Sequence, residues 1–231
     1  HGHGNVSFPS VSTFTLKASL ERAEPFFFMI REEAKARGKG VTETERSLAQ
    51  LGQKSFLYLW SYPGVHNDKG LGQELCDLLV VFGDHVIIFS DKHCAFPKSG
   101  VVLTDWKRWH RRAVHSSFKQ LMGAERWIRK HPNRIFLDQQ CSVSFPLDIP
   151  KSPIIHRVAV VHGIGEACRT FFGSGSGSLL VTSNTNIEDD LPFYVNLGGQ
   201  DSPFVHILDD TSLNLLLDTL DTVPDFVEYL V

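Results

Sequence analysis

Two nearly apolar segments, separated by a two-residue turn, stand out in the hydrophobic pattern of this chain. Residues 75–82 and 85–90 carry few polar side chains, and Gly83 and Asp84 connect them. Short apolar runs bounded by a turn signal are typical of buried strands. The pattern therefore predicts a hairpin of two buried strands, with charged residues toward the strand ends.

Apolar side chains recur at helical spacing elsewhere, which predicts amphipathic helices over 17–37, 42–59, 105–130 and 211–230. Thr42 precedes Glu45 at the spacing of a capping box, which favours a helix start there. Shorter apolar runs predict strands over 134–137, 154–161, 179–182 and 204–208, and Ser-Tyr-Pro-Gly at 61–64 predicts a turn. Helices and strands in this order indicate an α/β fold, with a central mixed sheet flanked by helices.

Length and composition indicate a globular protein. The chain has 231 residues, enough for one domain with a substantial core, and we expect a single domain over 1–231. Its core is expected over about 40–165, and 166–231 adds the C-terminal strands and helix. A hydrophobic content of 42% excludes a disordered protein. No apolar run reaches about 18 residues, no signal peptide is visible, and the four cysteines are scattered, so we expect a cytoplasmic protein with reduced thiols and no membrane contact.

Charge is distributed unevenly along the chain. The net charge is only -3, which excludes an overall basic protein, but eight Lys and Arg residues face a single acid within 106–131. A local basic face of this kind can bind phosphates. The nucleic-acid contacts are predicted at Arg108, Arg111, Arg112 and Lys119. The alternative is a surface helix whose basic face is simply solvated.

Three charged residues near the ends of the predicted hairpin strands suggest chemistry. Asp77 lies in the first strand, and Asp91 and Lys92 follow the second. Carboxylates hold Mg²⁺ (or Mn²⁺), and an ammonium group can orient a water molecule or steady a scissile phosphate. We therefore expect these three side chains to converge at one end of the sheet.

The arrangement resembles the PD-(D/E)XK nuclease superfamily, which has the restriction-endonuclease-like fold. In that pattern a helix supplies Glu, a strand supplies Asp, the next strand ends in (Asp/Glu)-x-Lys, and a helix packs beside the site. The resemblance covers about 40–130 and implies that Glu45, Asp77 and Lys92 match the helix acid, strand acid and lysine. It also implies that Gln120 matches a Gln carried on the following helix, and that Asp77, Asp91 and Glu45 bind the metal.

The chain departs from this pattern at Ser90, which stands where the acid two positions before Lys92 is expected. Neighbouring residues of a regular strand point to opposite faces, so Asp91 joins Asp77 only if a bulge or the strand end re-aims it. Otherwise the site has lost a ligand, and it is weak, recruits Glu74 or Glu45, or is inactive.

The resemblance implies a metal-dependent nuclease that hydrolyses phosphodiester bonds, with DNA favoured over RNA, in restriction, phage defence or repair. The alternative is a catalytically degenerate module of the same fold that binds nucleic acid or a protein partner. A hydrolase with Ser90 or Cys94 as its nucleophile is disfavoured, because no Gly-x-Ser-x-Gly sequence surrounds Ser90. Strand specificity, sequence specificity, pathway and a homo-oligomeric state are left open by the sequence.

Overall fold

The computed structural model of the chain describes residues 60–173, 175–182, 191–196, 203–220 and 222–231, all within the unit Gly40–Val231. The helices predicted over 17–37 and 42–59 lie outside the described residues, and Glu45 lies outside them too. The described part has the predicted α/β architecture, with a six-stranded mixed sheet flanked by helices.

The sheet begins as an antiparallel meander and continues with parallel strands, in the order β4-β1-β2-β3-β5-β8. The meander is formed by β1 (Ser61–Asn67), β2 (Gln73–Phe82) and β3 (His85–His93), which confirms the predicted hairpin. Strands β5 (Ile154–His162) and β8 (His206–Asp209) then run parallel to β3. Strand β4 (Ile135–Phe136) borders β1, and β6 (Leu180–Thr182) pairs with β7 (Tyr194–Asn196) in a separate small sheet.

Strand β1 occupies the segment that was predicted as a turn at 61–64. Its outer neighbour β4 pairs only with His66 and Asn67. Among the described strands, none therefore pairs with the outer side of the first half of β1, and Pro63, which lacks an N–H group, is tolerated at such an edge. The turn signal of Pro63 and Gly64 was overridden by pairing with β2.

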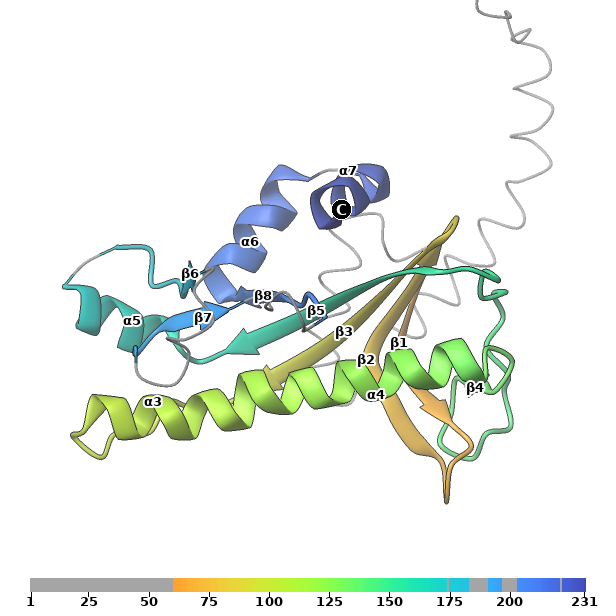
Figure 1. Cartoon of the computed structure of the whole chain (residues 1–231), viewed down its shortest axis with the longest axis horizontal. Coiled ribbons are helices and arrows are strands. Elements are labelled where there is room, and N and C mark those ends of the chain that lie inside the picture. Colours follow the sequence, from red (N-terminus) through yellow and green to blue (C-terminus); the bar gives the residue numbers. More distant parts are fainter. Residues whose placement is uncertain (1–59, 174, 183–190, 197–202, 221) are drawn as a thin grey trace, which may run out of the picture. The chain divides into compact units, whose positions relative to one another are not determined.

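The helices lie on both sides of the sheet (Figure 1). On one side, α3 (Val102–His110) continues through a π-helical turn (Arg111–His115) into α4 (Ser116–Lys130), close to the single helix predicted over 105–130. On the other side lie α6 (Asp210–Thr219) and α7 (Val223–Leu230). One helix was predicted there, but Thr222 caps a second helix that has Pro224 in its first turn, where a missing N–H does no harm. Helix α5 (Gly165–Phe172) was not predicted.

Strand β3 is buried on both of its faces, and its side chains alternate between two separate cores. Val86 and Ile88 pack in the core that includes Trp106, Trp109 and Leu121 of the α3–α4 helices. Ile87 and Phe89 pack in the core that includes Leu213 and Phe226 of α6 and α7. Because successive side chains of a strand point to opposite faces, Ser90 and Lys92 face α4, whereas Asp91 and His93 face α6.

Cys76, Cys94, Cys141 and Cys168 are all free thiols, as predicted. Among the described residues, no helix has both the length and the apolar character needed to cross a lipid bilayer.

His206 provides a test of how burial couples stability to pH. Burial next to His156 lowers the pKa of His206 from 6.5 to about 4. Between these values the unfolded chain binds the proton and the folded chain does not, so the free energy of unfolding rises as the pH increases from about 4 to 6.5. We expect the urea midpoint to rise over this interval, and His206→Gln to reduce the rise. An equal pH dependence in the variant and the wild type would show that another group is responsible.

Candidate functional site

Asp77 and Lys92 meet where strands β2 and β3 separate. The residue pairing between these strands ends at Leu78 and Phe89, so the backbone N–H of Asp91 has no partner in the β2 main chain. It donates instead to Oδ2 of Asp77 at 2.9 Å. The Nζ atom of Lys92 lies 3.5 Å from the same oxygen, as expected for a diagonal pair on one sheet face. The side chains of Asp77 and Lys92 are only 11% and 27% exposed, so this ion pair is largely shielded from water.

Helix α4 adds Gln120 to this face of the sheet. The hydroxyl of Ser90 donates to Oε1 of Gln120 at 2.9 Å. Ser90 is fully buried, and this bond satisfies its hydroxyl between the strand and the helix. Asp77, Ser90, Lys92 and Gln120 thus form one polar cluster, which we call the α4-face cluster. Their predicted chemical roles remain predictions.

Asp91 does not join the α4-face cluster through its side chain, in contrast to the predicted convergence. Strand β3 pairs with β5 without interruption from His85 to His93, so no bulge re-aims Asp91. Its backbone N–H bonds Asp77, but its carboxylate points to the opposite side of the sheet. The metal site predicted for Asp77, Asp91 and Glu45 is therefore not assembled from the Asp77 and Asp91 carboxylates, and Glu45 lies outside the described residues.

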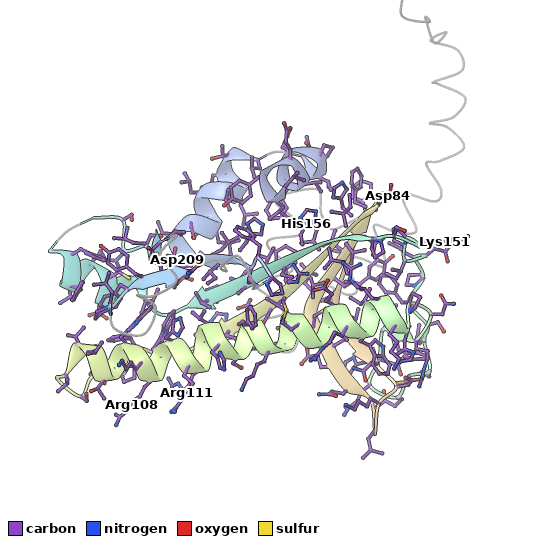
Figure 2. The ribbon with its side chains drawn as sticks, viewed as in Figure 1. Asp84, Arg108, Arg111, Lys151, His156 and Asp209 are labelled. Carbon is purple, nitrogen blue, oxygen red and sulfur yellow. The ribbon has the colours of Figure 1, made fainter. Side chains whose placement is uncertain are left out.

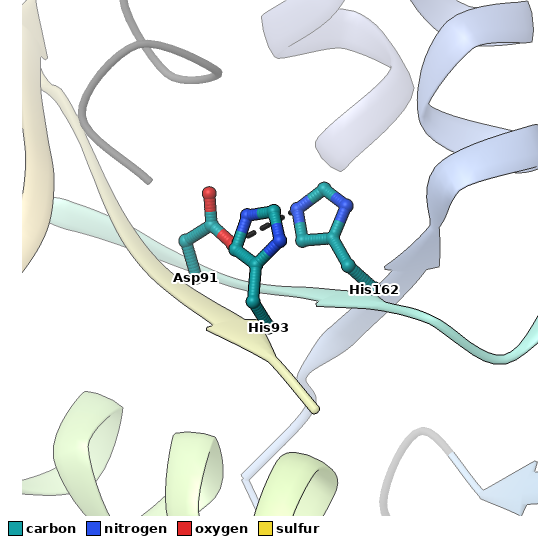
Figure 3. Close-up of side chains that lie close together, drawn as sticks. All are labelled: Asp91, His93 and His162. Atoms are coloured by element: carbon teal, nitrogen blue, oxygen red, sulfur yellow. Dashed lines mark ion pairs between the residues drawn. The ribbon is translucent and has the colours of Figure 1, made fainter. Parts of the chain in front are cut away.

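A second polar cluster, the α6-face cluster, contains Asp91, His93 and His162. One ligand atom from each of these residues lies within 4.8 Å of the others. Asp91 and His93 are two residues apart on β3, and His93 is paired with His162 of β5. The two imidazole rings stack with centroids 3.9 Å apart and planes 10° apart. Figure 3 shows the three side chains projecting from β3 and β5 to the side of α6, away from the helices of the opposite face.

Helix α6 contributes Asp210 to this second cluster. Asp209 is the N-cap of α6 and accepts backbone hydrogen bonds from Thr211 and Ser212, which fixes the start of the helix. Asp210 therefore lies in the first turn, where its Oδ1 contacts Nδ1 of His162. Its other oxygen accepts a bond from the N–H of Gly163 at 3.3 Å. Gly163 has φ +81°, and a Cβ there would lie 2.7 Å from the carbonyl oxygen of Cys94, so this turn requires glycine.

Burial and charge act in opposite directions on His162. Burial alone would lower its pKa, but the hydrogen bond to Asp210 and the negative charge of Asp91 raise the pKa to about 9. The same contact holds the pKa of Asp210 below its ordinary value. Without another cation, His162 therefore carries a positive charge at neutral pH.

The predicted nucleic-acid contacts divide into two groups along the basic helix. Arg108 and Arg111 are exposed and point away from the sheet (Figure 2), and Arg112 is held by the Ala95 carbonyl at 3.0 Å. Lys119 instead lines a groove between α4 and the β1–β2 end of the sheet.

This groove has a volume of about 440 Å³, and Gln120 is also in its wall. Four cations surround it: Lys69, Lys119, Arg126 and Lys130. The groove is therefore a basic surface that adjoins the α4-face cluster through Gln120.

Sequence reasoning missed His93, His162 and Asp210, although a signal was available for two of them. The chain contains no His-Glu-x-x-His sequence, the spacing at which a helix presents two zinc ligands. On a strand, the relevant spacing is two residues, which Asp91 and His93 have. His162 ends an apolar strand, but its pairing with His93 depends on the parallel register of β3 and β5.

Comparisons of this chain with protein-family models, with curated proteins and with solved structures find no match, so the candidate site rests on the residues and geometry described above.

Proposed function

We propose that this protein is a metal-dependent nuclease that hydrolyses phosphodiester bonds in nucleic acid at the α4-face cluster. The observation that carries the proposal is the pairing of Asp77 with Lys92 at 3.5 Å, at the point where β2 and β3 separate. A largely shielded acid–lysine pair needs a reason, because taking both charges out of water is costly. A role in phosphoryl transfer would explain why this shielded ion pair is present.

The chain order of the parts supports a restriction-endonuclease-like core. The strand with the acid (β2) is followed by the strand with the lysine (β3), and the α3–α4 helix then packs on the face they share. This is the order that the resemblance to PD-(D/E)XK nucleases implies, and Gln120 lies on the expected helix.

Each residue has a role in the proposed hydrolysis. Water attacks the phosphorus atom, and the bond from phosphorus to the leaving oxygen breaks, which yields a phosphate monoester and a hydroxyl group. The Lys92 ammonium stabilises the negative charge that builds up on the phosphate oxygens. Asp77 holds Lys92 in place, and Gln120 fixes Ser90 and the helix beside the reacting phosphate.

The oxygen donors of this cluster fit Mg²⁺ or Mn²⁺. Such ions are commonly bound through one or two carboxylates, with water and substrate phosphates as the remaining ligands. Asp77 offers its Oδ1, to which no described residue donates a hydrogen bond. Glu74, three residues earlier on β2, lies in the groove wall. When bound, the ion would polarise the phosphate and activate water.

The second candidate function is a non-catalytic module that binds nucleic acid, and Ser90 favours it. Ser90 replaces the expected acid, and its hydroxyl is committed to Gln120 at 2.9 Å. The basic groove serves either function, because neutralising phosphates releases counterions whether or not cleavage follows. Binding without cleavage in Mg²⁺ or Mn²⁺ would select this second function.

Lys92→Met should abolish cleavage and preserve the fold. Loss of one group that stabilises the transition state costs about 10²–10³ in rate. The test is cleavage of plasmid and single-stranded DNA and of RNA in Mg²⁺ and in Mn²⁺, with circular dichroism to check folding. Lys151→Ala, which removes an exposed lysine away from the cluster, is the matched control and should cleave like the wild type. Wild-type rates for folded Lys92→Met would remove the lysine from the mechanism.

The groove cations should dominate binding of nucleic acid. Each phosphate contact contributes a slope of about -0.7 to -0.9 to the dependence of log affinity on log salt. Changing Lys119, Arg126 and Lys130 together to Gln should weaken binding and flatten this slope by about 2. The matched triple variant replaces Arg108, Arg111 and Arg112, and we expect it to have the smaller effect because these residues lie outside the groove wall.

Fluorescence anisotropy of a labelled oligonucleotide over a salt series measures both triple variants. A larger effect of the Arg108, Arg111 and Arg112 variant would place the binding face on the α3 end of the helix instead. Unchanged affinity and slope in both variants would mean that the helix is a solvated surface and would contradict a nucleic-acid substrate at this site.

A further inference from the structure

The α6-face cluster contains a buried carboxylate whose hydrogen-bonding capacity is unused. The side chain of Asp91 is 0% exposed, and neither of its oxygens has a hydrogen-bond partner among the described residues. Buried carboxylates are nearly always satisfied by donors or by a cation, because desolvating an unpartnered charge is costly. Among the described residues its charge is opposed by the imidazoles of His162 and His93, so a cation bound between these rings and the carboxylate would satisfy it.

The neighbouring imidazole nitrogens show where that ligand would lie. Nε2 of His162 lies 2.9 Å from Oδ1 of Asp91, an ion-pair distance, and has no hydrogen-bond partner with satisfactory geometry among the described residues. Nε2 of His93 is 3.6 Å from the same oxygen. Ligand atoms bound at about 2.0–2.2 Å to one ion in tetrahedral geometry are separated by roughly 3.3–3.6 Å. The separations of 2.9 and 3.6 Å lie close to this range, and all three ligand atoms are within 4.8 Å of one another. Because the two imidazole planes now lie 10° apart, one ring must turn for both nitrogen lone pairs to meet at a shared ion.

We infer that Asp91, His93 and His162 form a binding site for a divalent transition metal ion on the α6 face of the sheet. Asp210 supports this assignment, because it holds Nδ1 of His162 and leaves Nε2 directed at the site. A metal-bound histidine typically gives its other ring nitrogen to a carboxylate in this way. The site lies on the opposite sheet face from Asp77 and Lys92, so it does not depend on the proposed nuclease function.

The donor set selects the class of ion. Two imidazole nitrogens and one carboxylate oxygen suit Zn²⁺ and Fe²⁺, whereas Mg²⁺ prefers oxygen ligands alone. Three protein ligands leave a coordination position for water or a small anionic ligand. The His93 side chain is 34% exposed, so this open position would be reached from its side of the cluster.

The same contacts can also be explained without metal, as an imidazolium held between two carboxylates. In that case His162 is protonated and compensates Asp91 and Asp210, and His93 merely stacks on it. The two arrangements differ in the importance of His93. As a ligand it contributes directly to affinity for the ion, whereas as a stacked ring it contributes nothing to metal binding.

Isothermal titration of the whole, metal-stripped chain with Zn²⁺ distinguishes these arrangements. We expect one ion per chain, and affinity at least about tenfold lower for His93→Gln and about 10–100-fold lower for Asp210→Asn. Both substituted side chains are partly exposed, at 34% and 48%, so the fold should tolerate the changes. The visible absorption of Co²⁺ bound in place of Zn²⁺ reports whether nitrogen and oxygen ligands surround the ion.

His85→Gln is the matched control, because His85 lies on the same strand and its ring nitrogen contacts the ring of His156, at 2.9 Å, and not a carboxylate of the α6-face cluster. It should bind Zn²⁺ like the wild type. A second control, His1→Gln with His3→Gln, removes the histidines of the N-terminal His-Gly-His-Gly sequence and should also leave one tight site. The inference is overturned if wild-type chain binds no Zn²⁺, or if His93→Gln and His85→Gln bind it with equal affinity.

Discussion

The burial of β3 between two layers of helices is the constraint on which the rest of the structure depends. A strand that is covered on both faces must send consecutive side chains into different cores, and β3 does so from Val86 to Phe89. The alternation continues past the apolar residues into the polar end of the strand. Consecutive residues there cannot share one site unless the strand is interrupted, and its pairing with β5 is continuous.

The direction of the strands explains why polar residues gather at this end. Strands β3, β5 and β8 are parallel, so their carboxyl ends meet at one edge of the sheet, where ligands commonly bind in α/β proteins. His93, His162 and Asp209 are the last residues of these strands, and Asp210 follows at once in α6. The antiparallel strand β2 brings Asp77 to the same edge, next to the last residue pair of β2 and β3, with its side chain on the other face.

The two clusters are distinct in chemistry but share one segment of main chain. The Asp77 carboxylate accepts the N–H of Asp91, so the same residue anchors the α4-face cluster with its backbone and the α6-face cluster with its side chain. Oxygen ligands and an ammonium group on one face favour phosphate and hard cations. Imidazole and carboxylate on the other face favour a transition metal. Two different chemistries can thus occupy one sheet edge because the sheet separates them.

Local information in the sequence determined the hairpin of β2 and β3, the long basic helix and the α/β class, because each depends on periodicity and turn residues along a continuous segment. It also marked Asp77 and Lys92 as candidates, and the resemblance to PD-(D/E)XK nucleases added Gln120. The break between α6 and α7 and the strand at Pro63 depended on capping and on which strands lie alongside. The separation of Asp91 from Asp77, and the meeting of Asp91, His93, His162 and Asp210, were decided only by the tertiary structure. Such contacts depend on strand register and on helices packed from distant parts of the chain, which no local pattern specifies.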